Sequence, residues 1–580
     1  MSRRDLEQRP HVVGSPLADF GTPGLALVVV LLAGCMLGVI YLVGQMQAAR
    51  SGADYVGPLL AHLADIGAAW DPALDSSRLW AIGGGVTVAG WWVLLTGVLM
   101  WRARRNRHRE VRWARTRDLT DADLTVDGPQ PGRLIVGQSG RKLVATPRSH
   151  SLIVFGPSGS GKTAGFAAPG LLEWDGPAVV SSVKTDLLRI TRDERAKAGQ
   201  TLVYDPLNRL DDVARVGWDP LAQCDTYEGA QALSSALVSL SDFGRVEKGD
   251  FWQSSAQSLL APLLLAARRG SCSIREVRRW LNLAEWDTAR EFLADDPEAR
   301  ESLIGATDKT PRDTALSYVA TARVALGAYA SPAAVESTTM LPQLDLDALL
   351  DGRQTLYLVG DEDDQKLLRP LFVGLIDAIM RRAALRTNRG QRAGRPLLVL
   401  LDEAANSAPL QDLDRYASVA RDRGVQLVTI WQDLAQVEER FGADRARTIA
   451  NNHQAKVILP GVTDRDLLEW VSRLLGEERI LTRSGSNRVA GSGPNWSEQE
   501  TFQPLITIDE LRRMPPGKAV LLHGTTRPAR IDLRPYYRSK QWRHLADRWQ
   551  PAERASDAPT TPDVRSGSGA GDVPSRSERF

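Results

Sequence analysis

The 580-residue chain has only three cysteines, seven histidines and 6% aromatic residues. Its cysteines, Cys35, Cys224 and Cys272, lack the close spacing of metal ligands, and they are too few to build a disulfide-held secreted domain. The histidines form no H-x-x-x-H cluster, so a protein-bound zinc ion is not expected. Basic and acidic residues nearly balance, at 72 and 70, and the net charge of +2 does not itself indicate a nucleic-acid-binding protein.

Two long stretches, 24–44 and 79–101, contain no charged residue. A bilayer core is crossed by about 20 apolar residues in helical form, so each stretch is predicted to be a transmembrane helix. Arginines are concentrated directly after the second stretch, from Arg102 to Arg117, whereas the connecting segment 45–78 is acidic. The positive-inside rule then predicts a multi-pass protein of the cytoplasmic membrane with both termini in the cytoplasm, whose basic linker also contacts membrane lipids.

A phosphate-binding motif follows the apolar run Ser151–Phe155. It matches G-x-x-x-x-G-K-[ST] and consists of Gly156, Pro157, Ser158, Gly159, Ser160, Gly161, Lys162 and Thr163. Glycines allow main-chain N–H groups to surround a phosphate, and the helix that follows adds its positive N-terminal dipole. Lys162 would contact the β- and γ-phosphates, and the Thr163 hydroxyl would ligate Mg²⁺. This strand–loop–helix context predicts an ATP-binding site.

An acidic pair ends a second apolar run, Leu397–Leu401. Five consecutive apolar residues suit a strand buried on both faces of a parallel sheet. Asp402 would then hold the Mg²⁺ shell, and Glu403 would polarise the attacking water. Taken alone, such a run is also typical of an ordinary strand end. Together with the phosphate loop, it predicts an ATPase rather than a protein that only binds nucleotide.

Further β-prone runs alternate with helical stretches, which favours a doubly wound, mostly parallel α/β sheet. The runs are Ala178–Val183, Thr201–Tyr204, Thr355–Val359, Gln426–Trp431, Lys456–Leu459 and Ala519–Leu522. Between 224 and 340 the pattern is helical instead, which predicts an all-helical insertion in the sheet domain. Pro262 is expected to kink or split a helix over Gln253–Arg269.

The chain resembles the type IV secretion coupling proteins, the conjugative DNA-transfer ATPases of the TraG/TraD type, from about Arg133 to Tyr537. The phosphate loop and the acidic strand carry this resemblance together with shorter segments in the same order. Those segments are Trp218–Leu221, Asp250–Trp252, Asp402–Asn406, Gln426–Asp433, Pro515–Val520 and Arg534–Tyr537. One departure is Ser182–Asp186, where many relatives carry D-x-K-G-E, and it leaves the roles of Lys184 and Asp186 open.

The resemblance implies a RecA-like P-loop NTPase domain with an inserted all-helical subdomain, assembled as a homohexamer. It further implies that Gln432 senses the γ-phosphate or positions water. Arg421 would be an arginine finger that reaches a neighbouring subunit's site, with Arg423 as the alternative. The implied cofactors are ATP and Mg²⁺, and the implied partners are single-stranded DNA with its relaxase and the components of a type IV secretion channel.

The predicted organisation follows from these features. A cytoplasmic N-terminus (1–23), a transmembrane helix (24–44), an extracytoplasmic loop (45–78), a second transmembrane helix (79–101) and a basic linker (102–132) precede the nucleotide-binding domain. Its two parts (133–223 and 341–547) flank the helical insertion (224–340), and a tail (548–580) ends the chain. The tail is rich in Pro, Ser, Gly, Asp and Arg and is expected to be disordered, and Ser484–Pro494 is expected to be a loop.

The predicted function is therefore a membrane-anchored ATPase that feeds relaxase-bound DNA into a type IV secretion channel. Two alternatives remain at this stage. One is a receptor that docks protein effectors and never threads DNA, and the other is a double-stranded DNA translocase of the FtsK kind. The response of ATP hydrolysis to added DNA distinguishes them.

Overall fold

The structure is a computed structural model that describes residues 90–92, 95–96, 98 and 111–548, with gaps at 183, 212, 240–248, 362, 392–393 and 487–494. The chain divides into two compact units. The larger unit is formed by 113–475 and 506–580, and the smaller unit by 1–112 and 476–505. Each unit is described by itself.

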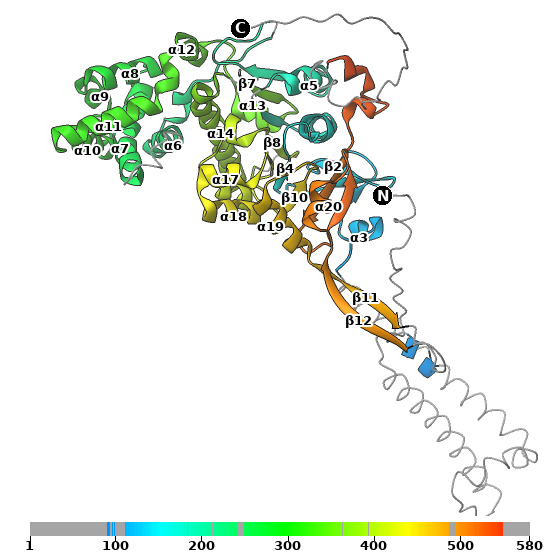
Figure 1. The fold of residues 1–580 in the computed structure, drawn as a ribbon. Coiled ribbons are helices and arrows are strands. Elements are labelled where there is room, and N and C mark those ends of the chain that lie inside the picture. The colour runs from blue at the N-terminus through cyan, green and yellow to red at the C-terminus, as the bar shows by residue number, and fades with distance from the viewer. Residues whose placement is uncertain are drawn as a thin grey trace, which may run out of the picture. The chain divides into compact units, whose positions relative to one another are not determined.

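A sheet of 12 strands is the centre of the larger unit (Figure 1), in the order β1-β3-β2-β14-β13-β10-β4-β9-β8-β5-β7-β6. The strands are β1 (Thr125–Val126), β2 (Ile135–Ser139), β3 (Lys142–Ala145), β4 (Leu152–Phe155), β5 (Ala178–Ser182), β6 (Thr201–Tyr204), β7 (Thr355–Val359), β8 (Leu397–Leu401), β9 (Val425–Trp431), β10 (Ala455–Ile458), β13 (Lys518–His523) and β14 (Ala529–Asp532).

The seven strands from β10 to β6 are mutually parallel. Every residue of β4, β5, β7, β8 and β9 is buried, as expected for the middle of a parallel sheet covered on both faces. The six further β-prone runs predicted from the sequence are strands at nearly the predicted bounds. Antiparallel strands β13, β14, β2, β3 and β1 extend the sheet beyond β10, so the sheet is mixed.

Helices cover this sheet because its strands present apolar side chains on both faces. Alternate strand residues, such as Leu152 and Val154 of β4, belong to a buried core that also contains Leu171 and Leu187. Leu171 lies on α4 and Leu187 on α5, so these two helices cover one face. The elements outside the helical segment are α3 (Thr116–Asp121), η4 (Lys162–Ala167), α4 (Ala168–Glu173), α5 (Asp186–Ala196), α13 (Leu346–Asp351), α14 (Gln365–Asn388), α15 (Ala404–Ser407), α16 (Leu413–Val419), α17 (Leu434–Phe441), α18 (Ala443–Asn452), α19 (Arg465–Leu475), α20 (Ile508–Arg512), η8 (Tyr536–Arg538) and η9 (Arg543–Arg548).

Between β6 and β7 the chain forms a group of helices, with α7–α11 lying to one side of the sheet in Figure 1. They are η5 (Pro220–Gln223), α6 (Tyr227–Val238), α7 (Gly249–Arg269), α8 (Ile274–Leu283), α9 (Asp287–Phe292), α10 (Pro297–Thr307), α11 (Arg312–Ala325), η7 (Gly327–Ala330) and α12 (Pro332–Thr339). Pro262 does not split α7. Proline lacks the N–H that would bond to the carbonyl of residue 258, and the Ser302 hydroxyl donates to that Ser258 oxygen instead, at 2.9 Å.

The two connections to this helical group run side by side. The Gly217 N–H donates to Pro342 O at 2.9 Å, and the Leu344 N–H donates to Gly217 O at 2.8 Å. A methyl group on Gly217 would lie 2.2 Å from Met340 O, so only glycine permits this approach.

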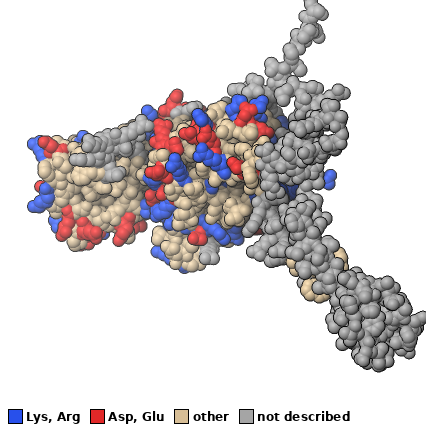
Figure 2. All heavy atoms as spheres, turned by 60° about the horizontal axis from the view of Figure 1, so that its bottom comes forward, with Lys and Arg blue, Asp and Glu red and all other residues tan. Residues whose placement is uncertain are grey.

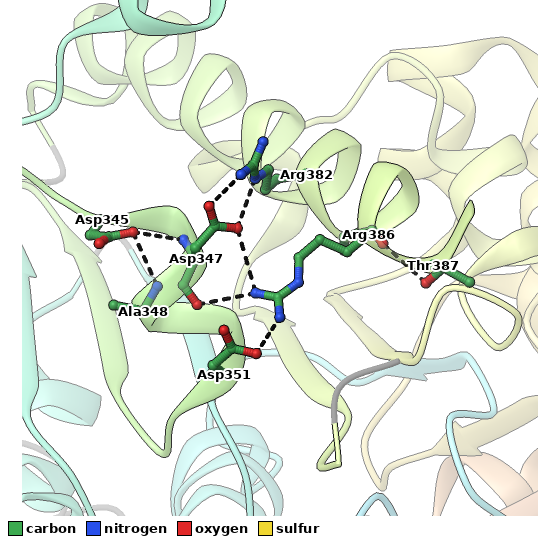
Figure 3. A network of polar contacts seen from close by, with 8 residues as sticks. Asp345, Asp347, Ala348, Asp351, Arg382, Arg386 and Thr387 are labelled. Atoms are coloured by element: carbon green, nitrogen blue, oxygen red, sulfur yellow. Dashed lines mark hydrogen bonds and ion pairs between the residues drawn. The ribbon is translucent and has the colours of Figure 1, made fainter. Parts of the chain in front are cut away.

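An ion-pair network holds α13, the helix that precedes β7, against α14, the helix that follows it (Figure 3). Arg382 of α14 donates from Nε to Asp347 Oδ1 at 2.8 Å and from Nη2 to Asp347 Oδ2. Arg386, one turn further, pairs with Asp347 and Asp351. Hydrogen bonding to Arg382 lowers the pKa of Asp347, with further contributions from both arginine charges. The network joins α13 and α14, the two helices that precede and follow β7 in the sequence.

In the smaller unit, β11 (Glu477–Ser486) and β12 (Asn495–Pro504) form an antiparallel hairpin with continuous pairing. The prediction of a loop at Ser484–Pro494 is wrong for Ser484–Ser486, because these residues belong to β11. Residues 487–494 lie outside the described residues, and β12 begins directly after them. The tail from 549 onward also lies outside them.

The structure contradicts the predicted location in the membrane. Within the described part of the chain, no helix combines the length and the apolar character needed to cross a bilayer. Helix α14, for example, is long enough to cross a bilayer, with 24 residues, but its charged side chains are incompatible with the apolar interior. These are Lys366, Arg369, Asp377, Arg381, Arg382 and Arg386. The predicted helix 24–44 lies outside the described residues, and only six residues of 79–101 are described.

Candidate functional site

Three neighbouring parallel strands, β4, β9 and β8, end at the same edge of the sheet. Phe155 at the end of β4 pairs with Trp431 at the end of β9, and Leu401 at the end of β8 pairs with Thr429. The segments that follow these strands therefore meet at one edge, because the carboxyl ends of parallel strands lie together. They carry the glycine-rich loop, Gln432 and the acidic pair.

The glycine-rich loop between β4 and η4 contains backbone conformations that residues with a side chain rarely adopt. Gly159 and Gly161 have φ values of +76° and +90°. A methyl group on Gly156 would lie 2.6 Å from Ser160 Oγ. Ser158 and Gly159 are exposed at the tip of the loop, so its main-chain N–H groups can reach an anion from solvent.

Lys162 begins η4 directly after this loop, and it is buried. Its Nζ donates a hydrogen bond to Gly156 O at 2.8 Å. Burial lowers the pKa of Lys162, while the negative charges of Asp402 and Glu403 oppose that shift. The ammonium group thus lies within electrostatic reach of both acids.

Asp402 follows β8 and is 5% exposed. Its N–H donates to Ser181 O on the adjacent strand β5 at 2.8 Å. Burial, and secondly the charge of Glu403, raise the pKa of Asp402 to about 6, although Lys162 opposes the shift. Its Oδ1 is buried and has no hydrogen-bond partner among the described residues. A buried carboxylate oxygen without a partner is suited to a cation ligand.

Glu403 adopts a left-handed backbone conformation, with φ at +50°. This conformation is costly for a residue with a side chain and is held here by the turn that follows. The N–H groups of Asn406 and Ser407 donate to Glu403 O at 2.8 and 3.0 Å. Arg369 of α14 donates to Asn406 O at 3.0 Å and to Asn406 Oδ1 at 3.2 Å. These bonds fix the Glu403 backbone beside Asp402, and the side chain is half-buried.

Thr163 and Gln432 complete the set at this edge. Thr163 lies in the first turn of η4, and its carbonyl accepts from the Ala168 N–H. Gln432 follows β9, and its N–H donates to Gln436 Oε1 at 3.1 Å. The preceding carbonyl, Trp431 O, accepts from the Gly156 N–H at 3.0 Å. The segment of Gln432 is thereby joined to the start of the glycine-rich loop.

Arg421 and Arg423 lie at the opposite edge, just before the amino end of β9. Burial, and then the charges of His523 and Arg421, lower the pKa of His150, which precedes the amino end of β4, to about 4. Arg421 is exposed, whereas the guanidinium of Arg423 lies 5.9 Å from the centre of the Tyr416 ring. The structure therefore does not bring either arginine to the glycine-rich loop of the same chain.

Lys184 is a residue whose role the sequence left open. It follows β5, the strand next to β8, and its charge acts on both Lys162 and Asp402. The only sequence signal for this placement is its position just after a buried strand at the carboxyl edge of the sheet.

Comparison with known proteins identifies relatives of this chain. Residues 112–558 match the family model described as "Type IV secretory system Conjugative DNA transfer". The conjugal transfer protein TraG of Escherichia coli is 25% identical over 409 residues, which cover 63% of this chain and 62% of that protein. VirD4 of Rhizobium rhizogenes is 21% identical over 474 residues, covering 78% of this chain and 69% of that protein. The chain thus spans less than two thirds of the length of that TraG protein.

Solved structures of the plasmid coupling protein TrwB share the fold. The form in complex with the non-hydrolysable ATP analogue ADPNP has a TM-score of 0.56 at 20% identity, covering 73% of this chain and 93% of TrwB. The form with ADP and Mg²⁺ has the same TM-score and identity. This likeness shows that the chain shares the α/β fold of TrwB, with a large mixed sheet. The family match covers more than half of the chain and confirms the family expected from the sequence: the protein belongs to the type IV secretory system conjugative DNA-transfer family.

Proposed function

We propose that this protein is an ATPase that couples relaxase-bound single-stranded DNA to a type IV secretion channel and drives its transfer. The observation that supports this most directly is the meeting of Lys162, Asp402 and Gln432 at the ends of three adjacent strands. The family match and the TraG, VirD4 and TrwB relatives support the link to conjugation.

ATP and Mg²⁺ fit the residues at this edge. The glycine-rich loop offers main-chain donors and Lys162 for the phosphates. The Thr163 hydroxyl and the unpartnered Asp402 Oδ1 are oxygen ligands of the kind that Mg²⁺ prefers. When bound, Mg²⁺ would neutralise charge on the β- and γ-phosphates. A TrwB structure contains ADP and Mg²⁺, which agrees with this choice.

The reaction is the attack of water on the γ-phosphorus, with cleavage of the bond to the departing ADP. Glu403 orients the water and accepts its proton, and the fixed backbone after β8 holds that carboxylate next to Asp402. Lys162 stabilises negative charge on the phosphoryl oxygens. Gln432 senses the γ-phosphate or positions the water from β9.

Arg421 acts in trans in a homohexamer. Its own glycine-rich loop lies at the other edge of the sheet, so only a neighbouring subunit's site is available to it. Arg421 is exposed, whereas Arg423 packs on Tyr416, which favours Arg421 over Arg423 as the finger. Such an arginine neutralises charge that develops in the transition state.

The domain organisation that goes with this function is a RecA-like nucleotide-binding domain in two parts, 133–223 and 341–547, with an all-helical insertion at 224–340. The charge distribution does not select the substrate. On the face in Figure 2, Lys and Arg side chains are interspersed with Asp and Glu, in line with the small net charge. The choice of DNA therefore depends on the relatives and on experiment.

The test is the rate of ATP hydrolysis by the full chain with no DNA, with single-stranded DNA and with duplex DNA. We expect stimulation that is strongest with single strands, and no turnover in the Lys162→Ala protein under any condition. Equal turnover in all three conditions would favour a receptor for protein effectors only. Stronger stimulation by duplex DNA would favour a translocase of the FtsK kind.

A further inference from the structure

Helix α14 runs between the two edges of the sheet. It follows β7 and precedes β8, and a helix that joins two parallel strands returns from the carboxyl end of the first to the amino end of the second. Near its beginning, Arg369 donates to Asn406 O and Oδ1 and so fixes the turn that carries Glu403. Asp377 lies further along the same helix, by about 12 Å at 1.5 Å per residue. Whatever Asp377 holds is therefore joined by one helix to the turn of Glu403.

Asp377 is a buried carboxylate, 7% exposed, and both of its oxygens accept hydrogen bonds. The hydroxyl of Tyr416, on α16, donates to Asp377 Oδ1, and Arg381 Nε, one turn further along α14, donates to Asp377 Oδ2. Burial, and next the charge of Asp377, raise the pKa of Tyr416, so the hydroxyl keeps the proton that it donates. Hydrogen bonds to a charged acceptor are roughly twice as strong as neutral ones. This bond therefore holds α16 against α14.

Tyr416 also contacts the segment that carries Arg421, on both sides of that residue. Before Arg421, the Ala420 N–H donates to Tyr416 O at 2.9 Å. After it, the guanidinium of Arg423 lies 5.9 Å from the centre of the Tyr416 ring. The Gly424 N–H donates to Arg421 O at 3.1 Å and closes the turn that leads into β9. Tyr416 and this turn together place the backbone of Arg421.

The backbone position of Arg421 matters because its side chain is exposed, whereas Ala420 directly before it is buried. An arginine that acts in a neighbouring subunit contributes only where its guanidinium meets the charge that develops in the transition state. A displacement of about 1 Å at such a group costs about 100-fold in rate. The contacts that place the Arg421 backbone therefore bear on the reaction in the neighbouring site.

We propose that Asp377 is a positioning residue that acts through Tyr416: the bond between them sets the direction in which Arg421 leaves its own chain. This inference rests on the proposed ATPase function and on the action of Arg421 in trans. Helix α14 then serves two sites of the homohexamer. Through Arg369 it holds Glu403 in the subunit's own site, and through Asp377 it directs Arg421 toward the site of the neighbour.

The first test is the kinetics of ATP hydrolysis by the full chain carrying Tyr416→Phe, with single-stranded DNA present. This variant keeps the ring that Arg423 contacts and loses only the hydroxyl that donates to Asp377. We expect kcat to fall by about 10- to 100-fold, the range for a misplaced group. KM for ATP should stay within about twofold, because the finger acts only in the transition state.

Tyr357→Phe is the matched control. Tyr357 is likewise buried, on β7, and its hydroxyl shares a hydrogen bond with Thr191 Oγ1 at 2.8 Å. Both variants lose one buried hydrogen bond, so both should show a similar fall in the thermal unfolding midpoint. Only Tyr416→Phe should lose kcat. An equal loss of kcat in the two variants would show a purely structural role for Tyr416 and overturn the proposal.

The second test is co-expression of Tyr416→Phe with Glu403→Gln, because α14 also holds the turn of Glu403 in the same chain. A Tyr416→Phe subunit has an intact Glu403, and a Glu403→Gln neighbour offers it a correctly placed Arg421. With random assembly of equal amounts, about one site in four then contains both intact groups. We expect about a quarter of the wild-type rate, above the mean of the two separate variants. A rate equal to that mean would place the defect in the subunit's own site and overturn the proposal.

Asp377→Asn tests whether Asp377 acts through Tyr416. Asparagine keeps a side-chain oxygen that accepts from the Tyr416 hydroxyl, so kcat should stay within about threefold of the wild type. Stability should fall nevertheless, because Arg381 loses its charged partner. A large loss of kcat in Asp377→Asn, with none in Tyr416→Phe, would show that Asp377 acts by another route.

Co-expression of Arg421→Ala with Glu403→Gln separates the possible failures. If this pair regains activity and the Tyr416→Phe pair does not, the positioning role is overturned and the finger remains. If neither pair regains activity although the wild type hydrolyses ATP, action in trans and the positioning role are overturned together. A wild type without any turnover would overturn the proposed ATPase function as well.

Discussion

The ammonium of Lys162 donates a hydrogen bond to the main-chain oxygen of Gly156 at 2.8 Å and thereby connects the two ends of the glycine-rich loop. The bond joins the first glycine of the motif to its lysine, so one side chain both shapes the loop and supplies its positive charge. The two acids that follow β8, two strands away from β4 in the sheet, act on the same ammonium. Lys162 therefore interacts both with the glycine-rich loop, through Gly156, and with the acidic pair, Asp402 and Glu403.

Lys162→Ala should weaken binding of ATP with Mg²⁺ by about 10- to 100-fold, the loss expected when a charge-assisted hydrogen bond is removed. Hydrolysis should fall below detection, because the variant loses the buried ammonium that stabilises charge on the phosphoryl oxygens. Lys184→Ala is the matched control, since Lys184 acts on the same acids but is exposed. Calorimetry and phosphate release provide the readouts. An equal loss in both variants would contradict a special role for Lys162.

Glu403→Gln and Asp402→Asn should separate the roles of the acidic pair. Glu403→Gln should lower kcat by about 10²- to 10⁴-fold, the usual contribution of a general base, with ATP affinity nearly unchanged. Asp402→Asn should instead raise the Mg²⁺ concentration needed for half-maximal activity, because it removes a carboxylate ligand. Steady-state kinetics at varied Mg²⁺ measure both effects. The assignment fails if the two variants show the same kinetic defect.

Arg421→Ala should lower kcat by about 10³-fold or more, as arginine fingers contribute on that scale. Mixing it with Glu403→Gln should restore part of the activity, because a site with intact Glu403 can receive Arg421 from a neighbouring Glu403→Gln subunit. Arg423→Ala serves as the control and should retain most activity, since Arg423 packs on Tyr416 of its own chain. A mixture no more active than the sum of its two parts would argue against action in trans.

The parts of this fold that could be predicted from sequence are those whose signal is local. Strands β4, β5, β7, β8 and β9 are continuous apolar runs because both of their faces are buried. By contrast, β14 reads Ala-Arg-Ile-Asp and β12 is mostly polar, so their strand character depends on partners far along the chain. Sequence reasoning therefore found β13 but missed β14, β2, β3 and β1, and it mistook part of the hairpin for a loop.

The candidate site likewise contains some parts that could be predicted from local sequence and others that could not. The glycine-rich loop and the Asp402–Glu403 pair are contiguous motifs, and each could be recognised by itself. The closeness of Lys184 to Asp402 depends on β5 lying beside β8. Strand order is set by the packing of distant segments, so no local pattern reveals these neighbours.

Arg195 should be among the most important residues for stability. It is 2% exposed and donates to Thr355 Oγ1 at 2.9 Å and to Gly176 O at 2.7 Å, and it also contacts the carbonyl of Trp174 at the end of α4. Burial lowers its pKa. Arg195→Met should cost about 3 kcal/mol or more, because it leaves these buried acceptors unpaired.

Urea unfolding followed by circular dichroism measures this cost. Arg192→Met, three positions earlier on α5 and partly exposed, is the control and should change stability by less than about 0.5 kcal/mol. Similar unfolding midpoints for the two variants would mean that the Arg195 hydrogen bonds contribute little.

His453 should make the fold less stable in mild acid. It is fully buried; Nδ1 donates to Ile449 O at 2.7 Å, and Nε2 accepts from Thr429 Oγ1 at 3.2 Å. Burial, and also the charge of Lys456, lower its pKa to about 4, although the Ile449 bond opposes the shift. The unfolded chain, with a histidine pKa of about 6.5, binds this proton first as the pH falls.

Stability from His453 is therefore complete above pH 6.5 and is lost as the pH falls toward 4. Between pH 7 and pH 5 the expected loss is about 2 kcal/mol in the free energy of unfolding. His453→Gln cannot titrate, so its pH dependence should be shallower by about that amount, even though its stability at pH 7 falls. Urea midpoints at pH 5, 6 and 7 decide the question, and parallel slopes for the wild type and His453→Gln would show that this histidine does not control the acid response.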